Sequence, residues 1–317
     1  MRRRPIVALA GGIGAARFLD GLTRVVPPGR VFIIGNTGDD AEMHGLHISP
    51  DLDTVTYTLA GLSDPVRGWG LRGDTFRCLE SLGQLGADTW FRLGDRDLAT
   101  HLYRTERLRQ GATLTDITRE ITAALKVRAT IVPMSDQRVR TRVRTATGEL
   151  DFQTYFVQRR ARDPVIGLRF EGAAEAQPAP GVIEAIAEAE AIILCPSNPF
   201  ISIGPILSIP GVRKALRARR HSVIGISPIV GGRAIKGPAA RMMKSMQLRP
   251  SAIEVAKLYL DFMGTFVMDN VDRKCAAEVE ALGLRAIVTN TIMTGMQQRK
   301  ALARVVARSL RKVGTKA

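Results

Sequence analysis

The sequence predicts an α/β protein built on a Rossmann-like, doubly wound and mostly parallel sheet. Short apolar runs of the kind that form buried parallel strands recur along the 317 residues. Segments with helical periodicity lie between many of these runs, an alternation typical of doubly wound folds. The first run also enters a glycine cluster and continues as a helical pattern, as a nucleotide-binding strand, turn and helix do.

Seven apolar runs are the predicted strands of this sheet. They begin near residues 6, 31, 129, 191, 222, 265 and 286. Most are apolar throughout, which indicates strands that are buried on both faces. The first follows a basic start that imitates a signal peptide, but residues 6–10 are too short for the hydrophobic core of such a peptide. We therefore expect this run to be the first strand.

Three helices are expected between the second and third strands. The sequence "SPD" at 49–51 combines a cap, a proline for the first turn and an acid near the positive end of the helix dipole. Asp95 should cap a second helix that runs to Gly111, and Thr113 opens a capping box for a third. We predict a helical insertion at about 60–127.

Residues 138–157 change to a period of two and turn at Thr147-Gly148. This pattern predicts an antiparallel hairpin within a region of about 136–180. The arginines of its first strand share one face, and they are Arg138, Arg140, Arg142 and Arg144. We interpret this face as a solvated edge strand protected by charge rather than as a substrate groove.

The alternation of strands and helices resumes after residue 180. The helical patterns of this half fall at 181–189, 210–219, 238–247, 251–262, 275–282 and 296–312. No linker, internal repeat or low-complexity segment divides the sequence. We therefore expect a single Rossmann-like domain that spans 1–317.

The formal charge of +16 favours anionic partners, such as nucleic acid, an acidic membrane or phosphorylated small molecules. Only 5% of the residues are aromatic and none of the stretches interleaves them with basic residues, which argues against nucleic acid. No apolar run reaches the roughly 18 residues that span a bilayer. The three cysteines lack a Cys-x-x-Cys motif, and His44 and His47 lack a third ligand. We expect a cytoplasmic protein without disulfides or zinc that acts on small phosphorylated molecules.

Four loops that follow predicted strands carry residues suited to a ligand. In a doubly wound sheet, ligands bind beyond the carboxyl ends of the strands. The first loop, Gly11-Gly12-Ile13-Gly14, allows close backbone approach at a helix N-terminus, where an anion is favoured. The others are "GNTGDD" after the second strand, "PSNPFISIGP" after the fourth and "PIVGGRAIKGP" after the fifth. Because they converge on one edge of the sheet, we interpret them as one binding site.

The glycine turn departs from the dinucleotide fingerprint. Read from Gly12 and Gly14, the third small position of Gly-x-Gly-x-x-Gly is Arg17, and no lone acid occupies the ribose position after the second strand. P-loop and nucleophile-elbow motifs are absent, which removes P-loop NTPases and α/β-hydrolases. An NAD(P)-dependent oxidoreductase that uses this turn is the alternative function.

Acidic residues form the second half of the predicted site. Asp51 and Asp53 lie at one helix start, Asp95 and Asp97 at another, and Asp136 follows a strand. They either cap helices, which is worth about 0.5–2 kcal/mol each, or help to form a Mg²⁺ site, since this ion shares substrate phosphates. Residues two apart on a helix point to different sides, so Asp51 and Asp53 need not hold one ion. As an exposed acid in the first turn, Asp53 should contribute little to stability.

Several long motifs resemble one transferase family. They are "LAGGIGAARFLDGL", "NTGDDAEMHGLHISPDLDTVTYTLAG", "RLGDRDLATHLYRTERLRQGATLTDIT", "IVPMSD", "PSNPFISIGPIL" and "SPIVGGRAIKGPAA". Nearly the whole chain is similar to the 2-phospho-L-lactate transferase family of coenzyme F(420) biosynthesis. The resemblance implies transfer of a phosphorylated three-carbon acid from a guanosine diphosphate conjugate to the ribityl hydroxyl of 7,8-didemethyl-8-hydroxy-5-deazariboflavin (Fo), releasing GMP. It also implies a Rossmann-like fold, Mg²⁺ and a homodimer.

The resemblance also implies roles for individual residues. Asp53 and Arg92 match family positions that contact the deazaflavin acceptor. The residues that match the guanosine diphosphate side are Gly11, Gly12, Gly14, Ser197, Asn198, Pro199, Gly231, Lys236 and Gly237. Asn36, in the loop after the second strand, is a further candidate for substrate binding.

The candidate metal ligands are Asp39 and Asp51, and the candidate catalytic acids are Asp51 and Asp53. Such a transfer relies on in-line positioning and charge neutralisation, while an acid accepts the hydroxyl proton. A diphosphate donor without nicotinamide does not need the dinucleotide fingerprint, so Arg17 is compatible with this site. The three-carbon acid, whether phospholactyl, phosphoenolpyruvyl or phosphoglyceryl, stays open.

Overall fold

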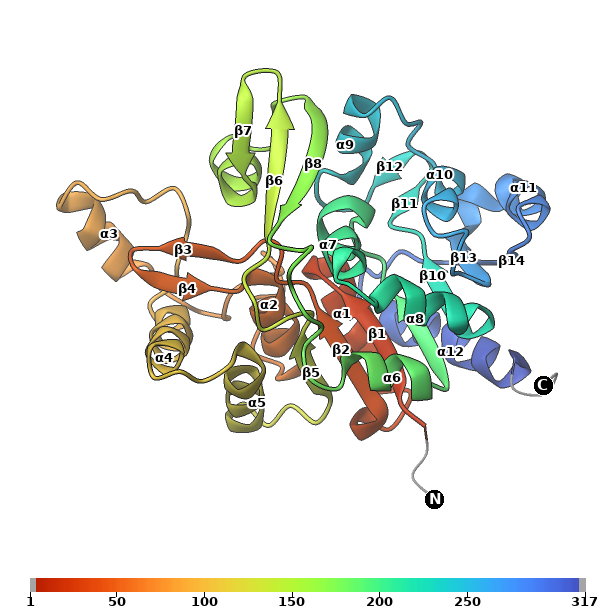
Figure 1. Cartoon of the computed structure of the whole chain (residues 1–317), viewed down its shortest axis with the longest axis horizontal. Coiled ribbons are helices and arrows are strands. Elements are labelled where there is room, and N and C mark those ends of the chain that lie inside the picture. Colours follow the sequence, from red (N-terminus) through yellow and green to blue (C-terminus); the bar gives the residue numbers. More distant parts are fainter. Residues whose placement is uncertain (1–3, 314–317) are drawn as a thin grey trace.

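The computed structural model describes residues 4–313 and confirms the predicted α/β class (Figure 1). Its central sheet has seven parallel strands in the order β14-β13-β10-β9-β1-β2-β5. They are β1 (Ile6–Ala10), β2 (Val31–Gly35), β5 (Thr130–Pro133), β9 (Ala191–Leu194), β10 (Val223–Ile226), β13 (Thr265–Asp269) and β14 (Arg285–Thr289). Each coincides with one of the apolar runs of the sequence.

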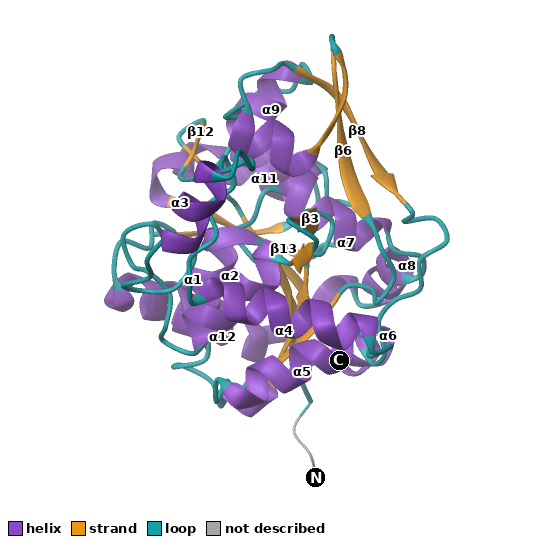
Figure 2. Ribbon diagram, turned by 90° about the vertical axis from the view of Figure 1, so that its left-hand side faces the viewer, coloured by secondary structure: helices purple, strands orange, loops and turns teal. Residues whose placement is uncertain are grey.

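The other elements surround this sheet (Figures 1 and 2). The helices are α1 (Gly12–Leu22), α2 (Pro50–Leu59), α3 (Arg77–Gln84), α4 (Asp97–Arg109), α5 (Leu114–Ala124), α6 (Val182–Glu188), α7 (Gly204–Ser208), α8 (Val212–Ala218), α9 (Ala239–Ser245), α10 (Ala252–Lys257), α11 (Ala276–Ala281) and α12 (Met296–Val313). Short 3-10 or π turns are η1 (Pro28–Arg30), η2 (Thr154–Gln158), η3 (Pro199–Ile203), η4 (Arg220–Ser222) and η5 (Asn270–Cys275). The remaining strands are β3 (Ala41–Met43), β4 (Leu46–Ile48), β6 (Arg140–Thr145), β7 (Gly148–Asp151), β8 (Val165–Glu171), β11 (Ile229–Val230) and β12 (Arg233–Ala234).

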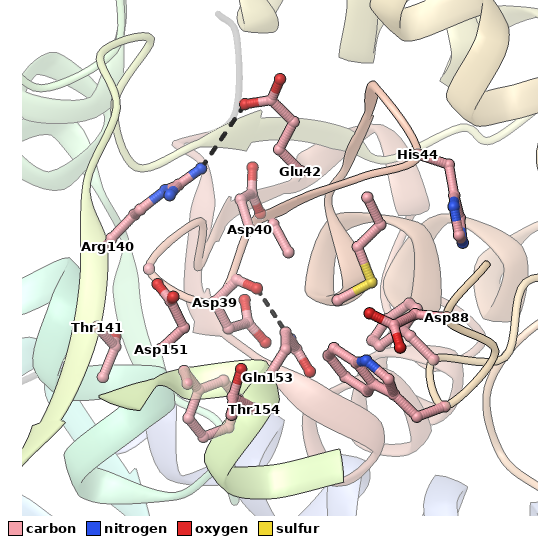
Figure 3. A pocket seen from close by; sticks show the side chains of 16 residues that line it. Asp39, Asp40, Glu42, His44, Asp88, Arg140, Thr141, Asp151, Gln153 and Thr154 are labelled. Carbon is pink, nitrogen blue, oxygen red and sulfur yellow. Dashed lines mark hydrogen bonds and ion pairs between the residues drawn. The ribbon is translucent and has the colours of Figure 1, made fainter. Parts of the chain in front are cut away.

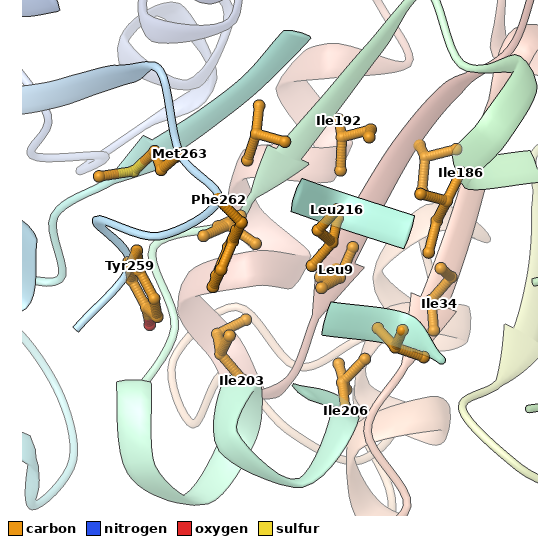
Figure 4. Close-up of a cluster of buried hydrophobic side chains, with 14 of the residues drawn as sticks. Leu9, Ile34, Ile186, Ile192, Ile203, Ile206, Leu216, Tyr259, Phe262 and Met263 are labelled. Atoms are coloured by element: carbon orange, nitrogen blue, oxygen red, sulfur yellow. The ribbon is translucent and has the colours of Figure 1, made fainter. Parts of the chain in front are cut away.

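The first strand shows why the central strands are apolar throughout. Ile6, Ala8 and Ala10 face a core that they share with α1, α2 and α12. Val7 and Leu9 face the opposite core, to which α6, α8 and the segment after α10 contribute (Figure 4). Because helices cover both faces of the sheet, every residue of β1 is buried and none needs to be polar.

The strand order creates a crevice beside β1. From β1 the chain moves through β2 to β5 on one side, and it later returns to place β9 on the other side of β1. At such a reversal the loops after the two strands leave the sheet in opposite directions, and ligands bind between them. The glycine turn follows β1 and residues 195–198 follow β9, so two of the predicted ligand loops flank this crevice.

The helical insertion contains an exchange of caps that differs from the prediction. Asp95 does not cap α4; its carboxylate accepts the backbone N–H groups of Arg77 and Cys78 at the start of α3, at 3.0 and 2.9 Å. Asp74 instead accepts two N–H groups at the start of α4, at 2.9 and 3.1 Å. Each aspartate therefore caps the helix that the other one precedes, which ties the two helix starts together.

Other predicted helix starts have mixed outcomes. Thr113 caps α5 as expected, at 3.1 Å from a backbone N–H in its first turn. Asp136 also serves α5, since it accepts the N–H of Thr115 at 2.7 Å. Ser49 precedes α2 but makes no side-chain cap; its hydroxyl donates to Asp40 at 2.7 Å. A carboxylate from a neighbouring loop has drawn this hydroxyl away from its own helix.

The predicted hairpin is part of a three-stranded sheet in the order β7-β6-β8, which rises beside the central sheet (Figure 2). The expectation of an edge strand was wrong, because β6 lies in the middle and β8 was not predicted. Arg142 on β6 pairs with Asp151 at the end of β7 and with Glu171 at the end of β8, both at 2.5 Å. Arg142 thus holds the two neighbouring strands of β6 rather than protecting an open edge.

Two further expectations concern cysteines and membranes. Cys78, Cys195 and Cys275 are all free thiols, in agreement with the prediction of no disulfides. Within residues 4–313, none of the helices combines the length and the apolar character that crossing a bilayer requires.

Replacing Gly21 by alanine should destabilise the protein. A methyl group at this position in α1 would overlap the backbone carbonyl of Arg299 in α12. Overpacking of this kind costs about 1–3 kcal/mol, while alanine gains only about 1 kcal/mol over glycine inside a helix. We expect urea unfolding to show a net loss of up to about 2 kcal/mol. The control is Gly29→Ala, where nothing lies within 4 Å of the added methyl; equal stability of the two variants would contradict the close approach of α1 and α12.

Candidate active site

A cavity of about 620 Å³ opens at the carboxyl ends of the central strands. This volume is within the range of small-molecule sites, about 300–1,000 Å³. The predicted site residues that line it are Gly11, Gly12, Gly14, Asp39, Asp51, Asp53, Arg92, Ser197, Asn198, Lys236 and Gly237. Loops from both halves of the chain therefore meet in one place, as the convergence of strand ends predicts.

Three predicted site residues do not line this cavity. Asn36 is completely buried beneath it. Pro199 is buried in the first position of η3. Gly231 lies in the tight turn between β11 and β12, where its N–H donates to Asp272 at 3.1 Å. Turn geometry accounts for Pro199 and Gly231, and turn residues are the same types that surround phosphates.

The glycine turn is packed against its own protein more closely than the sequence suggested. A Cβ on Gly14 would overlap the carbonyl oxygen of Pro196, and one on Gly11 would lie 2.5 Å from an Asp51 oxygen. The hydroxyl of Ser197 donates to the Gly11 carbonyl at 2.8 Å. Gly14 is therefore needed for the contact between α1 and the loop after β9, whereas the sequence suggested that it makes room for a phosphate. Gly12 has a φ of +73°, which favours glycine, and its N–H donates to Asp51 Oδ1 at 2.6 Å.

Asn36 bonds two buried acids that line the cavity, Asp39 and Asp51. Its amide nitrogen lies 3.2 Å from an Asp39 oxygen and 2.9 Å from an Asp51 oxygen. Burial raises the pKa of Asp51 to about 6, and burial with the charges of Asp51 and Asp40 raises the pKa of Asp39 well above its ordinary value. Each shift shows that these carboxylates lack a nearby cation that would compensate their burial.

The Asp39 and Asp51 pair fits a divalent cation that shares a substrate. Within the described part of the chain, no three His, Cys, Asp or Glu side chains form a metal-binding group by themselves. Mg²⁺ is commonly held by one or two carboxylates together with substrate phosphates, so two acids at the edge of a phosphate site are sufficient. Asn36 fixes both acids from below and leaves them at the cavity wall.

Asp53 is buried, in contrast to the exposed first-turn acid expected from the sequence. Its side chain is 8% exposed and forms an ion pair with Arg104 of α4, in which both guanidinium Nη atoms donate to the two carboxylate oxygens. Asp51 and Asp53 do point to different partners, as helical geometry predicts. The burial of Asp53 depends on an arginine 51 residues away, which local sequence does not reveal.

Two cations without acidic partners line the cavity beside the glycine turn. Arg17, on α1, occupies the position that departs from the dinucleotide fingerprint, and Lys236 lies in the loop before α9. Burial and the charge of Arg299 lower the pKa of Arg17, and burial and Arg17 lower the pKa of Lys236. Neither forms an ion pair with an acid among the residues described, whereas Arg299 pairs with Asp20 at 2.7 Å. Two like charges held together in this way favour an anion.

Aromatic side chains form another part of the cavity lining, the aromatic wall. It consists of Trp69 and Trp90, the two tryptophans of the chain, with Phe91, Phe152 and Phe156. The rings of Phe152 and Phe156 stack with centroids 5.4 Å apart. In a chain with 5% aromatic residues, this concentration indicates a surface for a flat ring.

Arg92 also lines the cavity, and its guanidinium carbon lies 4.2 Å from the centroid of the Phe76 ring, on which it stacks. Asp53 lines the same cavity, so the structure brings both predicted acceptor residues to one site. Sequence reasoning missed the aromatic wall because its members come from the insertion and from the segment after β7. It also missed residues 291–294, which line the cavity. They follow the last strand, so the rule that ligands bind beyond the carboxyl ends of strands could have found them.

A smaller cavity of about 350 Å³ adjoins the first (Figure 3). The two cavities share Asp39, Trp90, Phe91, Phe152 and Gln153. Gln153 donates to the backbone carbonyl of Asp39 at 2.9 Å. Several carboxylates line this second cavity, in contrast to the net positive charge of the chain. His44 is exposed and lines this cavity, whereas His47 bonds Asp40 at 3.0 Å, so ion pairing accounts for His47.

The chain is similar to known proteins over nearly its whole length. The family model described as "2-phospho-L-lactate transferase CofD" matches residues 6–306. A 2-phospho-L-lactate transferase of Methanosarcina mazei is 38% identical over 304 residues, which cover 96% of this chain and 100% of the relative. A phosphoenolpyruvate transferase of Streptomyces griseus is 42% identical over 305 residues, 94% of this chain and 96% of the relative.

A crystal structure of a Bacillus halodurans protein of the UPF0052 family shares the fold. It superposes with a TM-score of 0.61 at 15% identity and covers 97% of this chain and 99% of its own. At this identity the likeness concerns the fold alone. The family match and the curated relatives both extend over nearly the whole sequence, and the chain therefore belongs to the 2-phospho-L-lactate transferase CofD family.

Proposed function

We propose that the protein transfers a phosphorylated three-carbon acid from a guanosine diphosphate conjugate to the terminal ribityl hydroxyl of Fo, releasing GMP, in coenzyme F(420) biosynthesis. The observation that carries the proposal is one cavity whose lining joins two chemically different sets of residues. One set offers unpaired cations and buried acids, and the other is the aromatic wall. The relatives named as phospholactate and phosphoenolpyruvate transferases support the same reaction class.

The donor binds where the strand order of the sheet reverses, between the loops after β1 and β9. Its diphosphate is an anion that Arg17 and Lys236 attract, and each lacks an acidic partner in the described structure. Ser197 and Asn198 lie on the other side of the crevice. A guanosine diphosphate conjugate does not need the small third residue of the dinucleotide fingerprint, so Arg17 favours this donor over NAD(P).

The acceptor binds at the aromatic wall. The deazaflavin ring stacks on rings such as those of Trp90 and Phe91. Arg92 and Asp53 contact its polar groups, as the family resemblance implies. Asp51 links Asp53 to the glycine turn, because it bonds Gly12 and is two residues from Asp53.

The reaction is an in-line phosphoryl displacement. The ribityl oxygen forms a bond to the phosphorus that carries the three-carbon acid, and the bond from that phosphorus to the oxygen of GMP breaks. GMP leaves with the bridging oxygen, and the hydroxyl proton passes to a carboxylate, for which Asp51 and Asp53 are the candidates. Arg17 and Lys236 neutralise negative charge on the leaving group.

The proposed reaction uses Mg²⁺, as the family resemblance implies. The resemblance also implies a homodimer, and we propose that the protein acts in the cytoplasm. Asp39 and Asp51 would hold the ion, since they are two buried acids without a compensating cation. When bound, it supplies charge neutralisation to the diphosphate. Asn36 orients both acids from behind.

The purified protein should convert Fo and one guanosine diphosphate conjugate into a phosphodiester and GMP. Mass spectrometry of reactions with the phospholactyl, phosphoenolpyruvyl and phosphoglyceryl donors identifies the product of each, and chromatography measures GMP in equal amount. NADH in place of the donor is the matched control and should be left unchanged. Absence of product with all three donors, or oxidation of NADH, would contradict the proposal.

Removing either unpaired cation should weaken donor binding. In Arg17→Met or Lys236→Met, one charge-assisted contact worth about 1.5–3 kcal/mol is lost, which raises the Kd for GMP about tenfold or more. Calorimetry with GMP measures this change, and fluorescence titration should show Fo binding within about twofold of wild type. Lys214→Met, an exposed lysine on α8 across the sheet, is the control. Unchanged GMP affinity in folded variants would place the diphosphate elsewhere.

Transfer should require Mg²⁺ and stop in excess chelator, because the leaving GMP needs its charge neutralised. Asp39→Asn keeps the shape of the side chain but removes its charge, so half-maximal activity should need at least about ten times more Mg²⁺. Asp136→Asn, at the start of α5 and outside the cavity, should keep the dependence of wild type. Full activity in chelator without divalent metal would refute the role of the ion.

A further inference from the structure

A buried polar network lies behind Asp53 at the cavity wall. It joins the facing sides of α2 and α4 and consists of Asp53, Tyr57, Asp97, His101 and Arg104. Asp53 and Tyr57 are four residues apart on α2, and Asp97 and His101 are four apart on α4. This spacing places each pair on one helix face, so the two faces meet along their polar sides.

The contacts of the network converge on Asp53. Arg104 donates from Nη1 to Oδ2 of Asp53 at 3.1 Å and from Nη2 to Oδ1. Nη1 also lies 3.3 Å from Nδ1 of His101, and a guanidinium only donates, so Nδ1 accepts. The ring proton is then on Nε2, which lies 3.4 Å from Asp97 Oδ1. Tyr57 donates to the same Asp97 oxygen at 2.7 Å.

The burial of this network is costly, and its position explains what it does. The side chains of Arg104 and His101 are each 2% exposed. Among the residues that the structure describes, Arg104 is the fully buried residue with the largest volume. A buried ion pair is generally no more stabilising than apolar side chains of similar size. The network therefore does more than hold α2 against α4: it fixes the carboxylate of Asp53, which lines the cavity, in one orientation.

We propose that Arg104 and His101 are positioning residues, which orient the Asp53 carboxylate so that its remaining lone pairs accept hydrogen bonds from the hydroxyl or N–H groups of the acceptor substrate. This inference rests on the proposed function, since it assumes that Fo binds at the aromatic wall within reach of Asp53. An ionised carboxylate has about four acceptor positions, of which Arg104 occupies two. The polyhydroxylated ribityl chain is the part of Fo with the matching donors.

The network also changes how Asp53 can be tested. In Asp53→Asn, an amide N–H₂ group would face the guanidinium of Arg104, and two donors would oppose each other. The variant leaves a buried positive charge without its partner, so it should be clearly less stable than wild type. Asp53 is buried and paired, so we expect it to contribute to stability, in contrast to the expectation from the sequence. Variants of the positioning residues therefore give a cleaner test.

The experiment uses Arg104→Lys, Arg104→Met and His101→Asn in the full chain. Fluorescence titration measures the Kd for Fo, calorimetry measures the Kd for GMP, and steady-state kinetics separates KM for Fo from kcat. Arg104→Met should raise both Kd and KM for Fo at least about tenfold, while Kd for GMP stays within about twofold. Arg104→Lys, which keeps the charge without the bidentate contact, should rescue part of the loss. His101→Asn should also raise KM for Fo.

The matched control is Arg107→Met on the same helix. Arg107 pairs with Glu120 at 2.9 Å outside the cavity, so its loss should leave Fo binding unchanged. If Arg104→Met does not fold, Arg104→Lys and His101→Asn carry the test. Folded variants that bind Fo as wild type does, or that lose Fo and GMP binding in parallel, would overturn the positioning role. A wild-type protein that neither binds Fo nor transfers to it would instead overturn the proposed function.

Discussion

The contact between the turn after β1 and the loop after β9 sets the geometry on which the site depends. Gly14 meets the Pro196 carbonyl with no room for a Cβ, and Ser197 bonds the Gly11 carbonyl at 2.8 Å. These contacts fix the start of α1 at the reversal of strand order. Asp51 is then held by the N–H of Gly12, and Asn36 is held between Asp51 and Asp39. A backbone contact at the sheet edge thus determines where the acids lie.

The cavity separates charges that the protein does not neutralise by itself. Arg17 and Lys236 are neighbours whose pKa values are lowered, while Asp39 and Asp51 are neighbours whose pKa values are raised. If these cations and acids paired with one another, each shift would be smaller, because an opposite charge favours the ionised form. Their separation leaves both sets available for the proposed roles, the cations for phosphate oxygens and the acids for a shared cation.

The predictability of the structure follows from how local each cause is. The seven strands were predictable because burial on both faces makes each run apolar by itself. The convergence of Asp39, Ser197 and Lys236 followed from their places after strands. The crossed caps of Asp74 and Asp95 were not predictable, since either acid precedes a helix and only tertiary contact decides which one it caps. The same holds for the burial of Asp53.

The cavity lining comes from two parts of the chain. The glycine turn and the loop after β9 belong to the doubly wound sheet, whose fold the Bacillus halodurans structure shares at 15% identity. The aromatic wall comes from the insertion and the segment after β7, and function resides in the side chains of a site more than in the fold. Asp53 belongs to α2, which packs on the sheet, whereas Arg104 belongs to α4 of the insertion. Their ion pair therefore joins the two parts, and the proposed reaction requires such a fixed geometry because its two substrates must meet in line.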